Sequence, residues 1–374
     1  MTHLITGATG MLGSAMALEL LARTDDPIWC LVRAAGQERA RVRLWQAMAR
    51  TAEEQDRTPV LTGAEQRLRA LPGDIGDPGC GLDGGPRPPP GRVHVWHSAA
   101  TLRYEPGFAE EIHHGNVIGT REVIGLARRW EAELTYISTA YVAGRRRGLQ
   151  PEKLPPADQP VNNRYERSKV IAERMVAESG LRWRILRPSA VVADSGTLRT
   201  GSFSGLYDLA ARVGRFRRQY ARRYGSRLLE RPSRLCGDGA GEINLVPLDH
   251  VAGHGVRAGL TGPPRTVFHL TNATAPTAQD MYGAAFAHGG LPEPEFVEDA
   301  GDMDEMDRLL ANMFAFHLPY TCSPKTFDRT NTAALVGDAA MAFAAPPHTI
   351  RDLLRNHIQR PHRYPRRTKE NTHA

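Results

Sequence analysis

Residues 1–13, MTHLITGATGMLG, contain the pattern from which the fold is predicted. Residues 3–6 form a short apolar run typical of a strand, glycines follow at every third position from residue 7, and residues 11–23 have the apolar spacing of a helix. A strand, a G-x-x-G-x-x-G turn and a helix make up the unit that binds dinucleotides. The first glycine permits a tight turn, the second lets backbone approach a pyrophosphate, and the third lets helix pack on strand. The helix N-terminus then offers free N–H groups to the phosphates.

Composition limits the remaining possibilities. The chain has 374 residues, of which 41% are hydrophobic, and this length suggests one large domain with a smaller one attached. No apolar run is long enough to span a membrane, and the first strand begins too early to leave room for a signal peptide. The four cysteines are far apart and include no C-x-x-C pair. We therefore expect a reduced, cytoplasmic protein without a structural metal site.

The second strand predicts the cofactor. Residues 28–32, IWCLV, form a buried strand that ends at Arg33, 20 residues beyond Gly13. An acid at this position would accept a hydrogen bond from the ribose 2′-hydroxyl of NAD, whereas an arginine suits the 2′-phosphate of NADP. Arg43, in the following helix, is a second candidate, because bidentate pairing makes arginine specific for phosphate. The alternative is a solvated arginine at a strand end.

Further apolar runs complete a parallel sheet. Asp74 follows the third run and could hydrogen-bond the adenine amino group, and the Gly- and Pro-rich stretch 76–92 predicts a surface loop on the adenine side. The small side chains of residues 98–101, after the fourth run, would let backbone lie against a cofactor. A long helix is expected over Phe108 to Trp130. The predicted third to seventh strands are Leu68 to Leu71, Val93 to His97, Leu134 to Ser138, Trp183 to Leu186 and Val267 to Thr271.

A tyrosine and a lysine provide the candidate chemistry. Tyr165 and Lys169 are four residues apart on a predicted helix and therefore share one face, and Thr139 lies at the carboxyl end of the fifth strand. A tyrosine hydroxyl has an ordinary pKa of about 10, and a nearby ammonium should lower it. Tyr165 could then protonate a carbonyl oxygen that receives a hydride, and Thr139 could fix that oxygen by a hydrogen bond.

In this order, the motifs resemble those of an extended short-chain dehydrogenase/reductase. Within that superfamily the chain is most similar to the thioester reductase group, relatives of fatty acyl-CoA reductases and of terminal reductase domains in non-ribosomal peptide synthetases and carboxylic acid reductases. The resemblance spans roughly residues 1–252. It departs from the family at GGPRPPPG, where a helix is usual, and at EEIHHG. The matching segments are TGATGMLG (6–13), CLVRA (30–34), ARVRL (40–44), LPGDI (71–75), HSAA (97–100), NVIGT (116–120), YISTAYV (136–142), YERSK (165–169), LRPSAV (186–191) and INLVPLDHVA (243–252).

The resemblance implies roles for single residues. Thr139, Tyr165 and Lys169 match the catalytic Ser/Thr, Tyr and Lys, and Asn116 matches an asparagine that supports the lysine through backbone and water. Arg33 and Arg43 match the arginines that hold the 2′-phosphate of NADPH. The residues expected to contact the cofactor are Thr6, Gly7, Thr9, Gly10, Met11, Leu12, Gly13, Arg33, Arg43, Asp74, Ile75, Ala99, Ala100, Thr101, Tyr165, Lys169, Pro188 and Ser189.

We expect a Rossmann-type doubly wound sheet with a smaller, mainly helical substrate-binding part. The NADP-binding domain would comprise residues 1–193, with 243–275 returning to it, and the substrate-binding part would comprise 194–242 and 276–358. Residues 359–374 are polar and basic and should be disordered. Helices interrupted by Gly214, Gly225 and Pro232 are expected over 203–235. The apolar stripe within 303–316 favours core or lid, and the adjacent His113 and His114 do not suggest a metal site.

Three functional classes fit these motifs. The first is an NADPH-dependent reductase of an acyl thioester on a carrier protein or coenzyme A, which releases an aldehyde and can continue to the alcohol. The second is an epimerase, dehydratase or dehydrogenase acting on a nucleotide sugar or a free alcohol. Ala140 and Tyr141 follow Thr139 where such dehydratases place acids, and Arg33 favours NADPH. The third is a non-catalytic NADP sensor, which usually lacks the Tyr/Lys pair.

The positive charge is local. The net charge is +7, and residues 212–234 hold nine arginines and one acid, Glu230, for a local charge of +8. An acidic acyl carrier protein could dock there through long-range attraction. A solvated helix face or a set of internal ion pairs is the alternative, and Gly225 and Pro232 divide the cluster. Nucleic acid is not expected, because no array of stacking aromatic residues accompanies the arginines.

Overall fold

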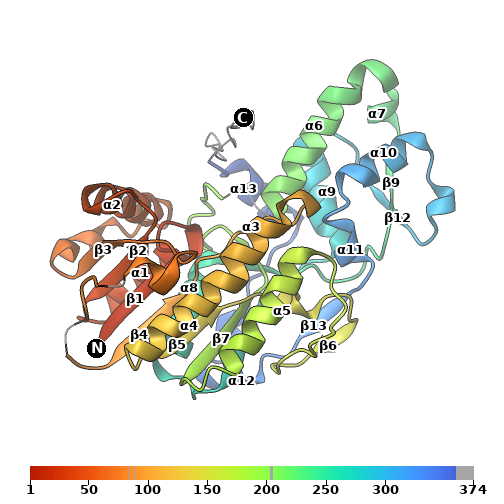
Figure 1. Ribbon diagram of the computed structural model, residues 1–374. Coiled ribbons are helices and arrows are strands. Elements are labelled where there is room, and N and C mark those ends of the chain that lie inside the picture. The colour runs from red at the N-terminus through yellow and green to blue at the C-terminus, as the bar shows by residue number, and fades with distance from the viewer. Residues whose placement is uncertain (83, 89, 203–204, 359–374) are drawn as a thin grey trace, which may run out of the picture.

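A seven-stranded parallel sheet forms the centre of the computed structural model, which describes residues 1–82, 84–88, 90–202 and 205–358 (Figure 1). The strand order is β3-β2-β1-β4-β5-β7-β11, and every neighbouring pair is parallel. This order reverses beside β1 and confirms the predicted doubly wound α/β fold. The strands are β1 (Thr2–Thr6), β2 (Ile28–Val32), β3 (Leu68–Pro72), β4 (Val93–His97), β5 (Glu133–Ile137), β7 (Trp183–Pro188) and β11 (Thr266–Leu270).

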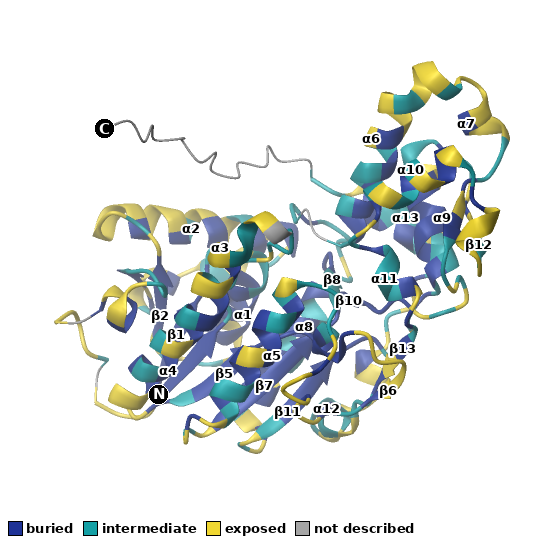
Figure 2. Cartoon of the chain, turned by 45° about the vertical axis from the view of Figure 1, so that its right-hand side comes forward, coloured by how far each residue is buried: buried dark blue, intermediate teal, exposed yellow. Residues whose placement is uncertain are grey.

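Helices cover both faces of the sheet, so its central strands appear buried in Figure 2. Because parallel strands are covered on both sides, they are continuous apolar runs, as in IWCLV. One core joins the sheet to α1, α2 and α8, and another joins it to α4 and α5. The helices that flank the sheet are α1 (Met11–Arg23), α2 (Gln37–Glu54), α3 (Ala109–His113), α4 (Gly119–Arg129), α5 (Arg164–Ala177), α8 (Leu248–Thr261) and α12 (Thr330–Val336).

A second core belongs to a mainly helical part that extends beyond the sheet (Figure 1). In the stripe within 303–316, Met306, Leu310 and Phe314 are buried in this core, which confirms the prediction of core packing. The helices are α6 (Leu206–Tyr224), α7 (Arg227–Glu230), α9 (Ala278–Gly289), α10 (Glu305–Met313), α11 (Leu318–Thr321) and α13 (Pro347–Arg355). Three short parallel pairs connect outlying segments: β8 (Ala190–Val192) with β10 (Leu245–Pro247), β9 (Arg234–Cys236) with β12 (Glu295–Val297), and β6 (Gly148–Gln150) with β13 (Lys325–Phe327).

Two predicted helices differ from expectation. The segment from Phe108 to Trp130 is divided by a π-helical turn, His114–Ile118, between α3 and α4. Gly214 does not interrupt α6, because the buried neighbours Val213 and Phe216 pack into the helical core and outweigh the roughly 1 kcal/mol that a glycine costs.

Two further predictions concern the ends of the helical part and of the chain. Gly225 does end α6, with φ of 54°. The predicted tail, 359–374, lies outside the described residues. None of the helices in the described part of the chain combines the length and apolar character needed to cross a bilayer.

Candidate active site

The turn after β1 has the geometry of a dinucleotide site. Gly7 has φ of 77°, and a Cβ atom placed on it would lie 2.6 Å from the backbone nitrogen of Ala99. A Cβ on Gly13 would collide with the carbonyl oxygen of Gly7. No side chain of the described chain caps α1, whose N-cap is Gly10, so its first N–H groups remain available at the positive end of the helix dipole. The turn, the close approach and the free helix end therefore fit a pyrophosphate.

The arginines predicted to recognise a 2′-phosphate lie together at the end of β2. The side chain of Arg33 is 77% exposed, and Arg43 donates a hydrogen bond to the carbonyl oxygen of Arg33. The Arg33 guanidinium also lies 3.7 Å from the Asp74 carboxylate, whose other oxygen accepts a hydrogen bond from the Gly76 amide. No acid follows β2 in the sequence, but the end of β3 supplies one in space. This exposed pair is weak, so an incoming phosphate could replace Asp74 as the partner of Arg33.

Thr139, Tyr165 and Lys169 converge at the carboxyl end of β5. The Thr139 hydroxyl accepts a hydrogen bond from the Tyr141 amide at 3.2 Å and caps the short turn that follows β5. Asn163 caps α5, which carries Tyr165 and Lys169. The Lys169 ammonium donates to the carbonyl oxygen of Ile137 at 2.9 Å and lies 5.9 Å from the centre of the Tyr165 ring. The helix thus holds Lys169 against the end of β5, with Tyr165 next to Lys169.

Burial dominates the acid–base properties of this pair. It raises the pKa of Tyr165 above its ordinary value, and the neighbouring Glu166 carboxylate adds to that effect. Burial also lowers the pKa of Lys169 to about 7, against the opposing influence of Glu173. The pKa of Tyr165 is thus raised and not lowered as predicted, because burial and the Glu166 carboxylate both disfavour the phenolate. Tyr165 therefore keeps its proton near neutral pH, although a raised pKa also makes its hydroxyl a weaker acid.

Asn116 connects the end of β4 with α5. Its side chain accepts a hydrogen bond from the Thr101 amide at 2.8 Å and donates to the Thr101 carbonyl at 3.1 Å. The same amide group donates to the Ser168 hydroxyl at 2.9 Å, and Ser168 donates to the carbonyl oxygen of Tyr165 at 2.7 Å. Asn116 lies in the π turn, a feature often found at functional sites. Its side chain reaches the residue before Lys169 rather than Lys169 itself.

The other predicted contact residues line the same edge. Ile75 follows β3 and packs against Gly119 at the start of α4. Pro188 ends β7, and the Ser189 hydroxyl donates to the Asn244 side chain at 2.6 Å. Thr6 ends β1. Around the turn and at the end of β4, the remaining predicted residues are Thr9, Met11, Leu12, Ala99, Ala100 and Thr101.

The helical part contributes residues that the sequence did not reveal. Tyr320 donates a hydrogen bond to Glu166, beside Tyr165, at 2.7 Å. Tyr104, from the segment after β4, stacks on Phe316 with ring centres 3.8 Å apart, and Arg212 donates to the Tyr104 hydroxyl at 2.7 Å. These contacts join residues more than 100 positions apart. No local pattern in the sequence could have indicated them.

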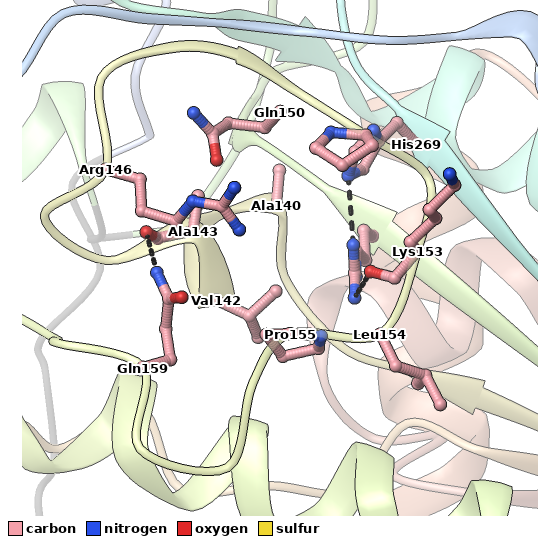
Figure 3. Close-up of a pocket in the computed structure, with 12 residues that line it drawn as sticks. Ala140, Val142, Ala143, Arg146, Gln150, Lys153, Leu154, Pro155, Gln159 and His269 are labelled. Atoms are coloured by element: carbon pink, nitrogen blue, oxygen red, sulfur yellow. Dashed lines mark hydrogen bonds between the residues drawn. The ribbon is translucent and has the colours of Figure 1, made fainter.

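A small cavity lies next to the short turn that follows β5, Ala140–Ala143 (Figure 3). It has a volume of about 30 Å³ and is lined by residues that include Ala140, Lys153, Arg187 and His269. Arg187 is fully engaged by the buried carboxylate of Glu173 at 2.6 Å. The cavity has room for water but not for a substrate. Among the described residues, no three His, Cys, Asp or Glu side chains gather as metal ligands.

Comparison with known proteins identifies the family. The family model described as male sterility protein, an NAD-binding family, matches residues 5–254. The chain belongs to this family. It is therefore an NAD(P)-binding reductase of the extended short-chain dehydrogenase/reductase type. This finding confirms the resemblance predicted from the sequence.

Relatives of this family member include much larger proteins. It is 27% identical over 295 residues to a linear gramicidin synthase from Brevibacillus parabrevis, covering 75% of this chain and 5% of that protein. It is 28% identical over 289 residues to an isonitrile lipopeptide synthase of Streptomyces coeruleorubidus, covering 75% of this chain and 18% of that protein. The chain thus spans less than a fifth of the length of these curated relatives.

Solved structures share the fold. The terminal R domain from the myxalamid PKS-NRPS pathway aligns with a TM-score of 0.71 and 24% identity, over 95% of this chain and 89% of that one. A thiolation-reductase di-domain from an archaeal non-ribosomal peptide synthetase aligns with a TM-score of 0.71 and 19% identity, over 95% of this chain and 74% of that one. UDP-glucuronic acid 4-epimerase from Bacillus cereus has a TM-score of 0.60 at 16% identity, covering 95% of this chain and 98% of that one.

Gly7 offers a test of the nucleotide turn with a matched control. Gly7 and Gly180 both have φ of 77°, but a Cβ on Gly180 would meet nothing within 4 Å. Gly7→Ala should therefore weaken binding of NADH or NADPH, whichever the unmodified protein binds better, at least about tenfold through the clash with Ala99. Gly180→Ala should bind it normally and lose only about 1 kcal/mol of stability. Fluorescence titration and thermal unfolding measure both effects. Equal affinity for that cofactor in the two variants would contradict the assignment.

Proposed function

We propose that the protein is an NADPH-dependent reductase of acyl thioesters carried by a carrier protein or coenzyme A, with an aldehyde as the first product. The observation that carries this proposal is the position of Lys169, which lies 5.9 Å from the Tyr165 ring and donates a hydrogen bond to Ile137 at the end of β5, directly before the segment that carries Thr139. A proton donor, a hydroxyl that can orient an oxygen and a dinucleotide turn are what carbonyl reduction needs.

The residues present fit NADPH. The uncapped end of α1 suits the pyrophosphate, and exposed Arg33 with Arg43 suits the 2′-phosphate. When bound, the reduced nicotinamide supplies the hydride. Thr139 would orient the substrate by donating a hydrogen bond to the thioester oxygen. Asn116 would keep the segment at Thr101 in place through its hydrogen bond to the Thr101 amide.

Proton transfer by Tyr165 completes the reduction. As the thioester carbon accepts the hydride, its C=O π bond breaks and Tyr165 gives its proton to the oxygen, which produces a hemithioacetal. The C–S bond then breaks. The tyrosinate takes back the hydroxyl proton, the sulfur leaves as a thiolate that is protonated from solvent, and the aldehyde is released. A second hydride and proton would give the alcohol.

The first prediction for this function concerns Tyr165. Tyr165→Phe removes the acid but retains the ring, so the variant should fold and bind NADPH. Its rate of NADPH oxidation with acyl-CoA or acyl-carrier substrates should fall about 10²–10⁴-fold, the usual contribution of one general acid. Product analysis of a thioester panel, with a nucleotide sugar as the alternative substrate, measures the rate and the reaction class. Near-normal thioester turnover in the variant would mean that another group supplies the proton.

The second prediction concerns cofactor choice. Arg33→Ala should raise the Michaelis constant for NADPH much more than that for NADH, because only NADPH carries the 2′-phosphate. Arg41→Ala is the matched control, since Arg41 is also an exposed arginine of this region but is engaged by Glu38 at 2.7 Å. Steady-state kinetics with both cofactors distinguishes the variants. If the unmodified protein uses NADH as efficiently as NADPH, the predicted preference for NADPH is refuted.

The arginine cluster divides into two groups. Acids from distant segments neutralise several of its members, so the local charge of +8 in the sequence does not exist as such in space. Arg223 pairs with Glu305 at 2.6 Å, and Arg231 pairs with Asp304 at 2.6 Å. Internal ion pairs thus explain much of the cluster. The other engaged members are Arg212, Arg217, Arg227 and Arg234.

Three arginines of α6 form the second group. Arg215, Arg218 and Arg222 are exposed and make no hydrogen bond or ion pair with any described residue. Their spacing of three and four residues places them on one face of the helix. The outer turns of α6 stand in solvent, as Figure 2 shows. At the inner end of the helix, Arg212 contacts Tyr104 of the segment after β4. We propose that this three-arginine stripe attracts an acidic carrier protein toward the site.

The third prediction tests the stripe. Replacing its three members together by glutamate should lower kcat/KM for a carrier-bound thioester about tenfold or more and weaken its salt dependence, because steering by charge acts on association. A short pantetheine thioester should be reduced as before. The control variant reverses three exposed arginines elsewhere, Arg39, Arg121 and Arg257. Equal losses with both substrates, or in the control, would show that the stripe does not dock the carrier.

A further inference from the structure

A continuous line of buried hydrogen bonds crosses the carboxyl end of the sheet, and its central residue, His97, has no part in the proposed chemistry. The Ala99 amide donates to the Thr6 hydroxyl at 3.2 Å, and this hydroxyl lies 2.7 Å from Nδ1 of His97. On the other side of the ring, Nε2 lies 3.0 Å from the Thr120 hydroxyl, which donates to the carbonyl oxygen of Asn116 at 2.7 Å. Thr6, His97, Thr120 and Asn116 are each at most 1% exposed.

The chemistry of the end groups fixes the direction of every bond. The Asn116 carbonyl can only accept, so the Thr120 hydrogen points to it and the Thr120 oxygen must accept from Nε2–H of His97. Burial, with Lys169 nearby, lowers the pKa of His97 to about 3, so the ring is neutral and Nδ1 is an acceptor. Nδ1 then takes the Thr6 hydrogen, which leaves the Thr6 oxygen to accept from Ala99.

The line connects three parts of the site. It starts at the turn after β1, where Thr6 precedes Gly7, and passes through the end of β4 at His97. It ends in the π turn, where the Asn116 side chain holds Thr101 and Ser168. Ser168 in turn contacts the backbone of Tyr165. A displacement of the π turn would therefore move both the segment at Thr101 and the helix that carries Tyr165 and Lys169.

We propose that His97, as the neutral Nε2–H tautomer, is a positioning residue for hydride transfer. Together with Thr6 and Thr120 it holds the π turn of Asn116 in register with the nucleotide turn. His97 lies within the sheet edge and acts on the reaction through Asn116. This role does not depend on the identity of the substrate, because it concerns how any carbonyl group is aligned with the dinucleotide site.

Thr120 provides a matched pair of variants. Thr120→Val keeps the shape but removes the hydroxyl that joins His97 to Asn116, whereas Thr120→Ser keeps the hydroxyl. The valine variant should lose about tenfold to a hundredfold in kcat, with little change in KM for NADPH, because small misplacements of catalytic groups cost that much. The serine variant should retain most of the activity. Thermal unfolding of each variant establishes the folded fraction at the assay temperature.

A purely structural role predicts a different outcome. The valine variant would then melt at a lower temperature but keep its kcat at temperatures where it is folded, and the serine variant would resemble it. An unchanged kcat in the folded valine variant, or a serine variant that behaves like the valine variant, would overturn the positioning role.

The tautomer can be measured without any substrate. In protein labelled with ¹⁵N-histidine, the His97 signals, assigned by their loss in His97→Asn, should show a protonated Nε2 and an unprotonated Nδ1 at neutral pH. An Nδ1–H tautomer or a charged ring would overturn the proposal. Because this measurement needs no thioester, it separates failure of the positioning role from failure of the proposed reaction.

Discussion

The site depends on a close backbone approach between the ends of two neighbouring strands. The turn after β1 passes so near to Ala99, after β4, that a Cβ at position 7 would lie 2.6 Å from the Ala99 nitrogen. Only glycine satisfies both this proximity and a φ of 77°. The approach brings Thr6 within hydrogen-bonding distance of Ala99 and His97, and so joins the nucleotide turn to the interior of the sheet. The end of α1 is left open to solvent and to a phosphate.

The helical part completes the other side of the site. Its Tyr320 contacts Glu166 at the start of α5, and its Phe316 stacks on Tyr104 after β4. Both contacts use aromatic side chains, which supply large contact areas with few rotatable bonds. Ion pairs connect α6 and α7 with the segment around α10, but most of their members are exposed, so each adds little rigidity.

Most of the sheet could be predicted from the sequence, because each buried parallel strand is an uninterrupted apolar run bounded by turn residues, as at residues 28–32. The Gly turn and the Tyr165/Lys169 pair are also local patterns. The π turn at Asn116 could not be predicted, since it depends on contacts with Thr101 and Ser168 that lie far away in the sequence. The same reason explains why the sequence suggests a charge of +8 for the arginine cluster: its neutralising acids, such as Asp304 and Glu305, lie some 80 residues later.

Transfer of deuterium from NADPH that carries deuterium at both C4 positions of the nicotinamide tests whether the protein reduces thioesters by hydride transfer. The protein is incubated with the labelled cofactor and an acyl thioester, and the masses of the trapped products are measured. We expect an aldehyde with one deuterium on its carbonyl carbon and one equivalent of free thiol. An unlabelled carboxylic acid, or no thioester consumption together with conversion of a nucleotide sugar, would contradict this expectation.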